Sequence, residues 1–168
     1  SKKVLDVINQ ALANREIREN YSISGIGYVR SEDRDAIPQA ADFLLTEDNV
    51  HTAIVYGIII KGDREMVVGS MRTNKVTLNP DEFLKEALGT TEEGRYYGGG
   101  RRGAGGFEIP IGFLAGIAED ELVRVKWRLY DELIKKKLFE KIHGQSPVVK
   151  SDGPVIRSVA GDPQNSES

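Results

Sequence analysis

Glycine and arginine gather in one short stretch of the sequence, Gly98-Gly99-Gly100-Arg101-Arg102-Gly103-Ala104-Gly105-Gly106-Phe107. Clustered glycines let a backbone approach a ligand closely and can turn N–H groups toward an anion, and arginine matches phosphate with paired donors. Residues 95–116 hold three arginines and one acid, so the segment carries +2 in a chain of net charge −3. We therefore predict a phosphate-binding turn formed by Gly98, Gly99, Gly100, Arg101, Arg102, Gly105 and Gly106. The alternative is a flexible loop with solvated arginines.

A second polar group, Ser70, Arg72 and Thr73, follows the predicted strand 65–71. Ser70 and Arg72 are two residues apart, so a strand places them on one face, and the Thr73 hydroxyl adds a third donor. We predict that all three donate to a phosphate. Taken alone, this pattern is more typical of a solvated strand end.

Composition and local sequence exclude several other kinds of binding site. The chain of 168 residues has no cysteine and two histidines, so thiolate zinc sites, disulfides and multi-histidine metal centres are excluded. A Walker loop would need Gly-Lys-Ser/Thr, whereas Gly103 is followed by Ala104 and Gly105. The segment Gly25-Ile26-Gly27 lacks the third glycine of a dinucleotide motif, because position 30 is arginine.

The hydrophobic pattern predicts an α/β domain with a mixed β-sheet and helices packed on it, α+β-like in its central hairpin. Its centre is the apolar run 51–60, which should pair antiparallel with 65–71. Asn79 and Pro80 start a helix that Gly89 ends. The other expected elements are a helix to about residue 20, a strand over 21–29, a helix over 37–46, a strand-like segment over 107–114 and a long helix over 119–143.

These elements predict three parts: a lead-in or linker helix (1–20), a folded domain that includes the long C-terminal helix (21–144), and a flexible tail (145–168). The longest uncharged apolar run, 52–60, is too short to span a membrane, and no signal peptide opens the chain. We expect a cytoplasmic protein without a membrane partner. The first residue is serine, which indicates a fragment of a longer protein.

The two polar motifs together resemble the C-terminal DHH-associated domain of the DHH phosphoesterase superfamily. That family has Ser-x-Arg-Ser and then Gly-Gly-Gly-His-x-x-Ala-Ala-Gly-Phe, which the segments 70–73 and 98–107 resemble. The resemblance covers about residues 21–113. It implies a substrate-binding domain beside a separate N-terminal catalytic domain that holds manganese or magnesium and hydrolyses phosphodiesters. Members include oligoribonucleases that also dephosphorylate phosphoadenosine phosphate, exopolyphosphatase-related proteins, RecJ-type exonucleases and the tail domain of alanyl-tRNA synthetases.

By this resemblance, Arg72 matches the family's phosphate-binding arginine, and Ser70 and Thr73 lie beside it. Gly98–Gly100 match the family's glycine turn. The family histidine is Arg101 here, which keeps a cation but cannot titrate. The chain has no Asp-His-His motif. We therefore expect no catalytic residue, no metal ligand and no cofactor in this fragment.

The expected partners are a nucleotide or a short single-stranded nucleic acid and the protein's own N-terminal DHH domain. The alternative is a non-catalytic RNA-binding or oligomerisation module, like the synthetase tail domains. The sequence leaves open the exact substrate, whether the long C-terminal helix packs on the sheet or forms a homodimer, and whether Tyr96 and Tyr97 stack on a base or pack beneath the glycine stretch.

Overall fold

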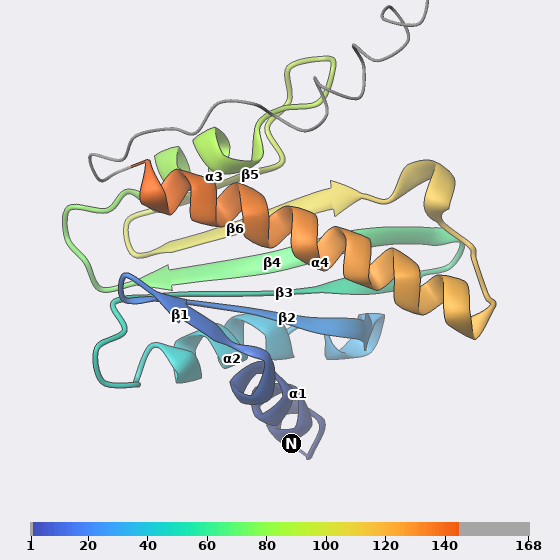
Figure 1. Cartoon of the computed structure of the whole chain (residues 1–168), viewed down its shortest axis with the longest axis horizontal. Coiled ribbons are helices and arrows are strands. Elements are labelled where there is room, and N and C mark those ends of the chain that lie inside the picture. Colours follow the sequence, from blue (N-terminus) through green and yellow to red (C-terminus); the bar gives the residue numbers. More distant parts are fainter. Residues whose placement is uncertain (1, 145–168) are drawn as a thin grey trace, which may run out of the picture.

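The computed structural model describes residues 2–144, so the predicted tail lies outside the described residues. Within this range the chain forms one mixed sheet with helices on both faces (Figure 1). The elements in chain order are α1 (Lys2–Asn14), β1 (Glu16–Arg18), β2 (Tyr21–Arg30), a 3-10 turn (Ser31–Asp33), α2 (Ala36–Leu44), β3 (Thr52–Lys61), β4 (Arg64–Thr73), α3 (Pro80–Leu88), β5 (Gly98–Arg101), β6 (Ala104–Pro110), a second 3-10 turn (Gly112–Leu114) and α4 (Asp120–His143).

The strand order across the sheet is β1-β2-β3-β4-β6-β5. β2 and β3 run parallel, and every other neighbouring pair is antiparallel. The apolar run TAIVYGIII of β3 lies near the centre of the sheet, and its first eight residues are buried because both faces are covered. The predicted mixed α/β fold class and the β3–β4 hairpin are confirmed.

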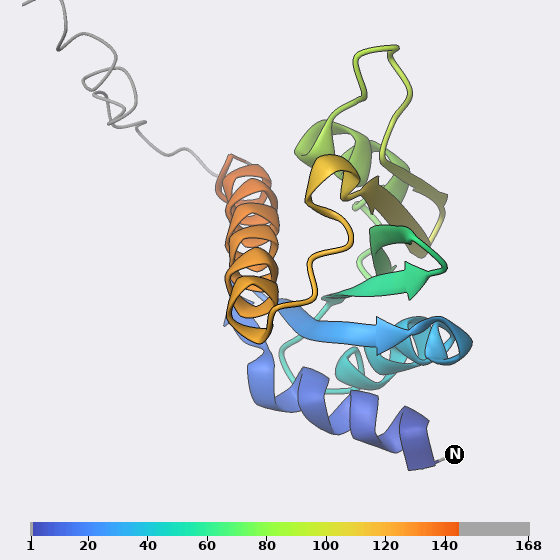
Figure 2. The same cartoon turned by 90° about the vertical axis from the view of Figure 1, so that its right-hand side faces the viewer.

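Two apolar clusters fill the space between the sheet and its helices. α1 and α2 cover one face through residues such as Ala11, Ile37 and Leu44, and α3 and α4 cover the other through Phe83, Leu84 and Leu138. Figure 2 shows α4 on one side of the sheet and α1 with α2 on the other. Alternate residues of β3 and β4 enter the two clusters, as the period of a strand requires.

Two local expectations hold and one is wrong. The Asn79 side chain accepts hydrogen bonds from the amides of Asp81 and Glu82, and Gly89 ends α3 with a φ of 78°. The first helix, however, ends at Asn14 rather than near Asn20. Residues 16–18 form an edge strand instead, joined to β2 by a turn in which Glu19 and Asn20 have φ angles of 49° and 71°. Asparagine tolerates this left-handed backbone, which makes a two-residue hairpin possible.

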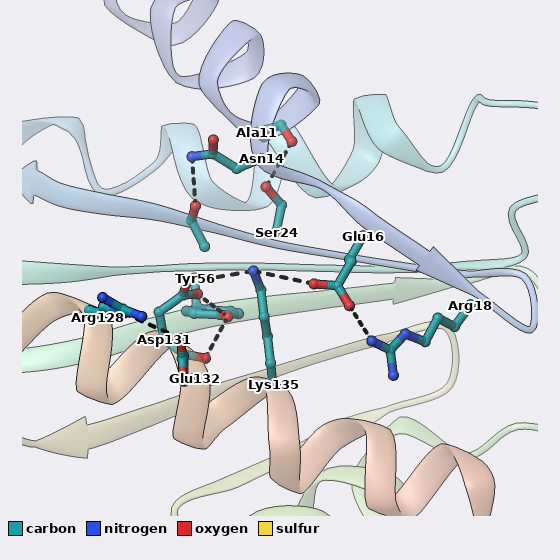
Figure 3. A network of polar contacts seen from close by, with 11 residues as sticks. Ala11, Asn14, Glu16, Arg18, Ser24, Tyr56, Arg128, Asp131, Glu132 and Lys135 are labelled. Carbon is teal, nitrogen blue, oxygen red and sulfur yellow. Dashed lines mark hydrogen bonds and ion pairs between the residues drawn. The ribbon is translucent and has the colours of Figure 1, made fainter.

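α4 packs on the sheet through one face, on which Ile134, Leu138 and Ile142 are buried. A polar network adds to this contact (Figure 3). The Tyr56 hydroxyl donates to Asp131 Oδ1 at 2.5 Å, and Lys135 lies between Asp131 and Glu16. Burial, together with the Asp131 carboxylate, raises the pKa of the Tyr56 phenol, so the phenol stays a donor.

The start of α4 is tied to β4 by a buried ion pair. Lys126 Nζ lies 2.7 Å from Glu65 Oε1, and the two side chains are 2% and 4% exposed. The Gly116 amide donates to the other Glu65 oxygen at 2.6 Å, and Lys126 also donates to the Leu114 carbonyl at 3.1 Å. Both charges are therefore matched by hydrogen bonds, as burial demands.

Replacing Lys126 with methionine should destabilise the fold by about 3–5 kcal/mol, because the Glu65 carboxylate is left buried without its cation. Urea unfolding at neutral pH measures the loss. The double variant Glu65→Leu, Lys126→Met removes both charges and should recover most of the stability. Equal losses in the single and double variants would contradict this account.

The same pair makes a prediction for acid pH. Burial alone would raise the pKa of Glu65, but hydrogen bonds from Lys126 and Gly116 outweigh it and hold the pKa below its ordinary value of 4.5. The stabilisation is therefore full above that value and is lost as the pH falls through the lowered pKa. The double variant should lose less stability in this range than the unaltered chain.

Candidate functional site

The glycine–arginine stretch is a β-hairpin rather than the predicted loop of amides turned toward an anion. Gly98 pairs with Phe107, Gly99 with Gly106, Gly100 with Gly105 and Arg101 with Ala104. Within this hairpin only Gly103, in the turn, has a positive φ, of 82°. Glycine has a low propensity for strands, so local patterns did not predict β5.

Three of these glycines, Gly98, Gly99 and Gly105, let α3 approach the hairpin closely, and a Cβ at Gly99 would lie 2.8 Å from Asp81 Oδ1. A Cβ at Gly105 would lie 2.8 Å from Leu84 Cδ1 and 3.2 Å from Pro80 Cβ. A Cβ at Gly98 would lie 3.1 Å from Leu84 Cβ. The hairpin is further held by Asp81 of α3, which accepts from the Gly100 amide at 2.9 Å. That hydrogen bond, with Lys85 beside it, holds the pKa of Asp81 below its usual range.

The opposite face of β4, β6 and β5 is open, and its residues lie in rows across the three strands. The pairing aligns Arg72 with Ala104 and Arg101 in one row, and Ser70 with Gly106 and Gly99 in the next. Directly paired residues share a face of the sheet. The pairing therefore aligns Ser70, Arg72, Gly99, Arg101 and Gly106 in two neighbouring rows. The shared face of Ser70 and Arg72 is the part of this arrangement that their spacing predicted.

A cleft of about 730 Å³ lies over this surface. Ser70, Gly99 and Gly106 line it. At Gly106 the absence of a side chain leaves the strand backbone accessible, whereas a Cβ at Gly99 would meet Asp81 and Lys85 of α3. The residues before α2 border it on one side and the segment 91–97 on the other. The lining residues are Arg34, Asp35, Pro38, Arg64, Met66, Val68, Gly69, Ser70, Thr91, Arg95, Tyr96, Tyr97, Gly98, Gly99, Gly106, Phe107, Glu108 and Pro110.

Cations predominate among the charged side chains of the cleft. Arg34, Arg64 and Arg95 outnumber Asp35 and Glu108. Arg34 pairs with Glu108 at 2.5 Å, whereas neither Arg64 nor Arg95 forms an ion pair within residues 2–144. Arg34 and Arg64 were not predicted as site residues, because no local pattern shows that the segment before α2 and the start of β4 border the same cleft.

The cleft also offers a free hydroxyl and an aromatic ring. Among the described residues, none hydrogen-bonds the Ser70 hydroxyl. Tyr96 is 53% exposed, and Lys85 Nζ lies 5.0 Å from its ring centre. Tyr97 is half-buried and packs against the core beneath the cleft. Tyr96 is therefore placed to stack on a base, whereas Tyr97 packs against the core.

Arg72 lies on the open face but does not line the cleft. Its Nε lies 3.0 Å from Asp42 Oδ1, and its Nη1 donates to the Met71 carbonyl at 3.0 Å. The Asp42 side chain is 61% exposed, so this ion pair is weak enough for a phosphate to compete with it. Arg101 and Arg102 are exposed at the hairpin tip and form no ion pair in the described part of the chain.

Thr73 does not share this surface, which corrects the expectation of three donors to one phosphate. It lies on the opposite face, is 8% exposed, and its hydroxyl hydrogen-bonds Thr52 at 2.7 Å and the His51 carbonyl at 3.0 Å. The odd spacing from Ser70 sends it to the other face of β4. Gly100 and Gly105 likewise serve the contact with α3 and β6 rather than the open face, and Gly98 both contacts α3 and borders the cleft.

Within residues 2–144, no group of three carboxylate or histidine side chains lies close enough together to hold a metal ion. The described residues therefore do not fit the manganese or magnesium of the implied catalytic domain, and we derive no step through a metal here. No helix in the same range is long and apolar enough to cross a membrane.

Comparison with known proteins gives one curated relative of substantial identity. The chain is 34% identical over 143 residues to the uncharacterized protein MJ1633 of Methanocaldococcus jannaschii, which covers 84% of this chain and 26% of that protein. The chain thus spans about a quarter of the length of that relative. No family model matches the chain, so the DHH-associated assignment stays a prediction from the motifs.

Solved structures that resemble the chain include two of known type. One is the pGpG-specific phosphodiesterase PggH of Vibrio cholerae, with a TM-score of 0.41 and 14% identity over 81% of this chain and 40% of that one. The other is the C-Ala domain of Aquifex aeolicus alanyl-tRNA synthetase, with a TM-score of 0.38 and 18% identity over 72% of this chain and 97% of that one.

Gly105, which packs against α3, and Gly106, which lines the cleft, should respond differently to substitution by alanine. Gly105→Ala should destabilise the fold by about 1–3 kcal/mol, because its Cβ would overlap Leu84 of α3. Gly106→Ala should cost less, because the nearest atom to its Cβ is the Gly69 carbonyl oxygen at 3.3 Å. Thermal unfolding of both variants tests this, and a larger loss at Gly106 would contradict the assignment of Gly105 to helix packing.

Proposed function

We propose that this chain binds the phosphate end of a nucleotide or of a short single-stranded nucleic acid in the cleft over β4, β6 and β5. The observation that carries the proposal is the pair of rows on the open face. A floor formed by Ser70, Gly106 and Gly99 lies next to a row with arginines at both ends, Arg72 and Arg101. Such a surface offers accessible backbone, one hydroxyl and several cations to an oxyanion.

The separation of Arg72 and Arg101 across the sheet would let the two side chains bind different oxygens of one phosphate. Arg72 and Arg101 are two strands apart, which is about 10 Å at the usual strand separation. A phosphate seated on the glycine floor lies within reach of either guanidinium, since both side chains are long and border that floor. The exposed Tyr96 ring at the side of the cleft provides a stacking surface for an attached base.

We further propose that the chain serves as the substrate-binding domain of a metal-dependent DHH-family phosphoesterase. The motif order from Ser70 to Phe107 and the cleft that these motifs border support this assignment. Hydrolysis would then be carried out by residues of another part of the protein. In this account the present chain holds and orients the phosphate and supplies no nucleophile.

A second candidate function is a non-catalytic RNA-binding module. It is favoured by Arg101 and Arg102, which are exposed at the hairpin tip outside the cleft, where a longer backbone could pass. The two candidates differ in ligand size: the cleft suits one or two nucleotides, whereas binding at the tip should strengthen with each added nucleotide.

Calorimetric titration with 3′-phosphoadenosine 5′-phosphate and with a short oligoribonucleotide tests the site. Arg95→Ala and Arg72→Ala should each weaken binding about tenfold or more, because each removes a charge-assisted hydrogen bond worth about 1.5–3 kcal/mol. Ser70→Ala should have a smaller effect. Affinity should also fall as salt rises.

The matched control is Arg124→Ala, which removes an exposed arginine of α4 that has no ion pair in the described chain. It should leave both affinities unchanged. An equal loss in Arg124→Ala and Arg95→Ala would show non-specific attraction and would contradict a site in the cleft.

Arg101→His restores the residue of the DHH-associated pattern and should make binding pH-dependent. A histidine is charged only below a pKa near 6.5, whereas arginine is charged throughout. With an oligonucleotide that has no terminal phosphate, and so no titration near neutral pH, the variant should bind more tightly at pH 5.5 than at pH 8. The same small pH effect in the variant and in the unaltered chain would show that residue 101 does not contact the ligand.

A further inference from the structure

The outward face of α4 carries a continuous apolar stripe. Leu122, Val125, Leu129 and Leu133 are 50%, 58%, 56% and 45% exposed. Their spacing of three, four and four residues places them on one side of a helix. The residues that fix α4 to the sheet, such as Ile134 and Leu138, lie on its other side and are buried.

No other element of the described chain lies against this stripe. A shallow groove of about 510 Å³ runs along it, and all of its lining residues belong to α4: Val125, Arg128, Leu129, Glu132, Leu133 and Lys136. A 24-residue helix is about 36 Å long, so the stripe is a substantial feature of the surface. Contiguous exposed apolar patches of this kind mark interaction surfaces.

Charges along α4 change sign from one end to the other. Asp120 and Glu121 are exposed at its start, and Lys136 and Lys137 are exposed beyond the stripe. None of these four forms an ion pair in the part of the chain that the structure describes. Arg124 near the first end and Glu140 near the second are also exposed and unpaired in the described chain, so the two ends carry net charges of −1 and +1.

We propose that α4 pairs antiparallel with α4 of a second copy of this chain. The sequence is self-complementary about Leu129: Val125 and Leu133 lie four residues to either side of it, and Glu121 and Lys137 lie eight. A two-fold axis near Leu129 thus places Val125, Leu129 and Leu133 of one copy on Leu133, Leu129 and Val125 of the other, and Leu122 beside the aliphatic stem of Lys136. It also places the acidic end of each helix beside the basic end of its neighbour.

Charge decides the direction of the pair. A parallel arrangement would bring the acidic ends together and the lysines together, which is repulsive. The antiparallel dimer also leaves the phosphate cleft accessible, because α4 and the cleft lie on opposite faces of the sheet. The proposal is therefore independent of the proposed function.

Sedimentation equilibrium of the chain from micromolar to millimolar concentrations tests the proposal. We expect a reversible monomer–dimer equilibrium. Leu129→Glu should weaken the dimer about tenfold or more, because it buries a charge at the centre of the interface. The control Val76→Glu changes a side chain that is 80% exposed outside α4 and should leave the dimer unchanged. A monomer at every concentration, or equal effects of both variants, would overturn the proposal.

Charge reversal and cross-linking test the direction. Glu121→Lys and Lys137→Glu should each weaken the dimer, and the double variant should restore it. Because the chain has no cysteine, Leu129→Cys introduces a single thiol, which should form a disulfide-linked dimer on mild oxidation. A parallel pair would also cross-link at 129, so Leu122→Cys decides the direction, because residue 122 faces its own copy only in a parallel pair. A cross-link at Leu122→Cys, or failure of the double variant to recover, would overturn the antiparallel arrangement.

Discussion

The fit of α3 against the β5–β6 hairpin is the constraint on which the rest of the structure depends. Gly98 and Gly105 bring the hairpin against Leu84 and Pro80, at distances that a larger residue could adopt only if these neighbours shifted. This contact holds a glycine-rich hairpin that has little strand propensity of its own. Because α3 occupies one face, the other face of the same hairpin stays open, and Gly99 and Gly106 form part of the cleft there.

The position of the cleft follows from how unevenly the helices cover the sheet. α1 and α2 pack over β2, β3 and part of β4, and they leave β6 and β5 uncovered on that face. Arginines from the segments before α2 and before β5 then border the open strands. The buried Glu65–Lys126 pair and the Tyr56–Asp131 hydrogen bond fix α4 on the opposite face, so the open face is not shared with the longest helix. The proposed binding site and the proposed dimer interface therefore use separate surfaces.

Local patterns predicted most of the scaffold. The apolar run of β3, the β3–β4 hairpin and the Asn79 and Gly89 ends of α3 each depend on residues close in sequence, and each is confirmed. The hairpin of β1 with β2 was missed, because residues 15–20 suit a helix locally and only pairing with β2 makes them a strand. For the site, spacing correctly placed Ser70 and Arg72 on one face but could not show that Arg34 and Arg64 approach β6, since that contact is long-range.

Backbone amide chemical shifts during titration with 3′-phosphoadenosine 5′-phosphate test the central claim most directly, because they report each strand separately. The account predicts that the largest changes fall on the open face, at Ser70, Gly99 and Gly106, with smaller changes at Arg72 and Arg101. The amides of α4 should not move. Changes confined to α4 or to the α1–α2 pair, or no change at saturating ligand, would contradict a phosphate site in the cleft.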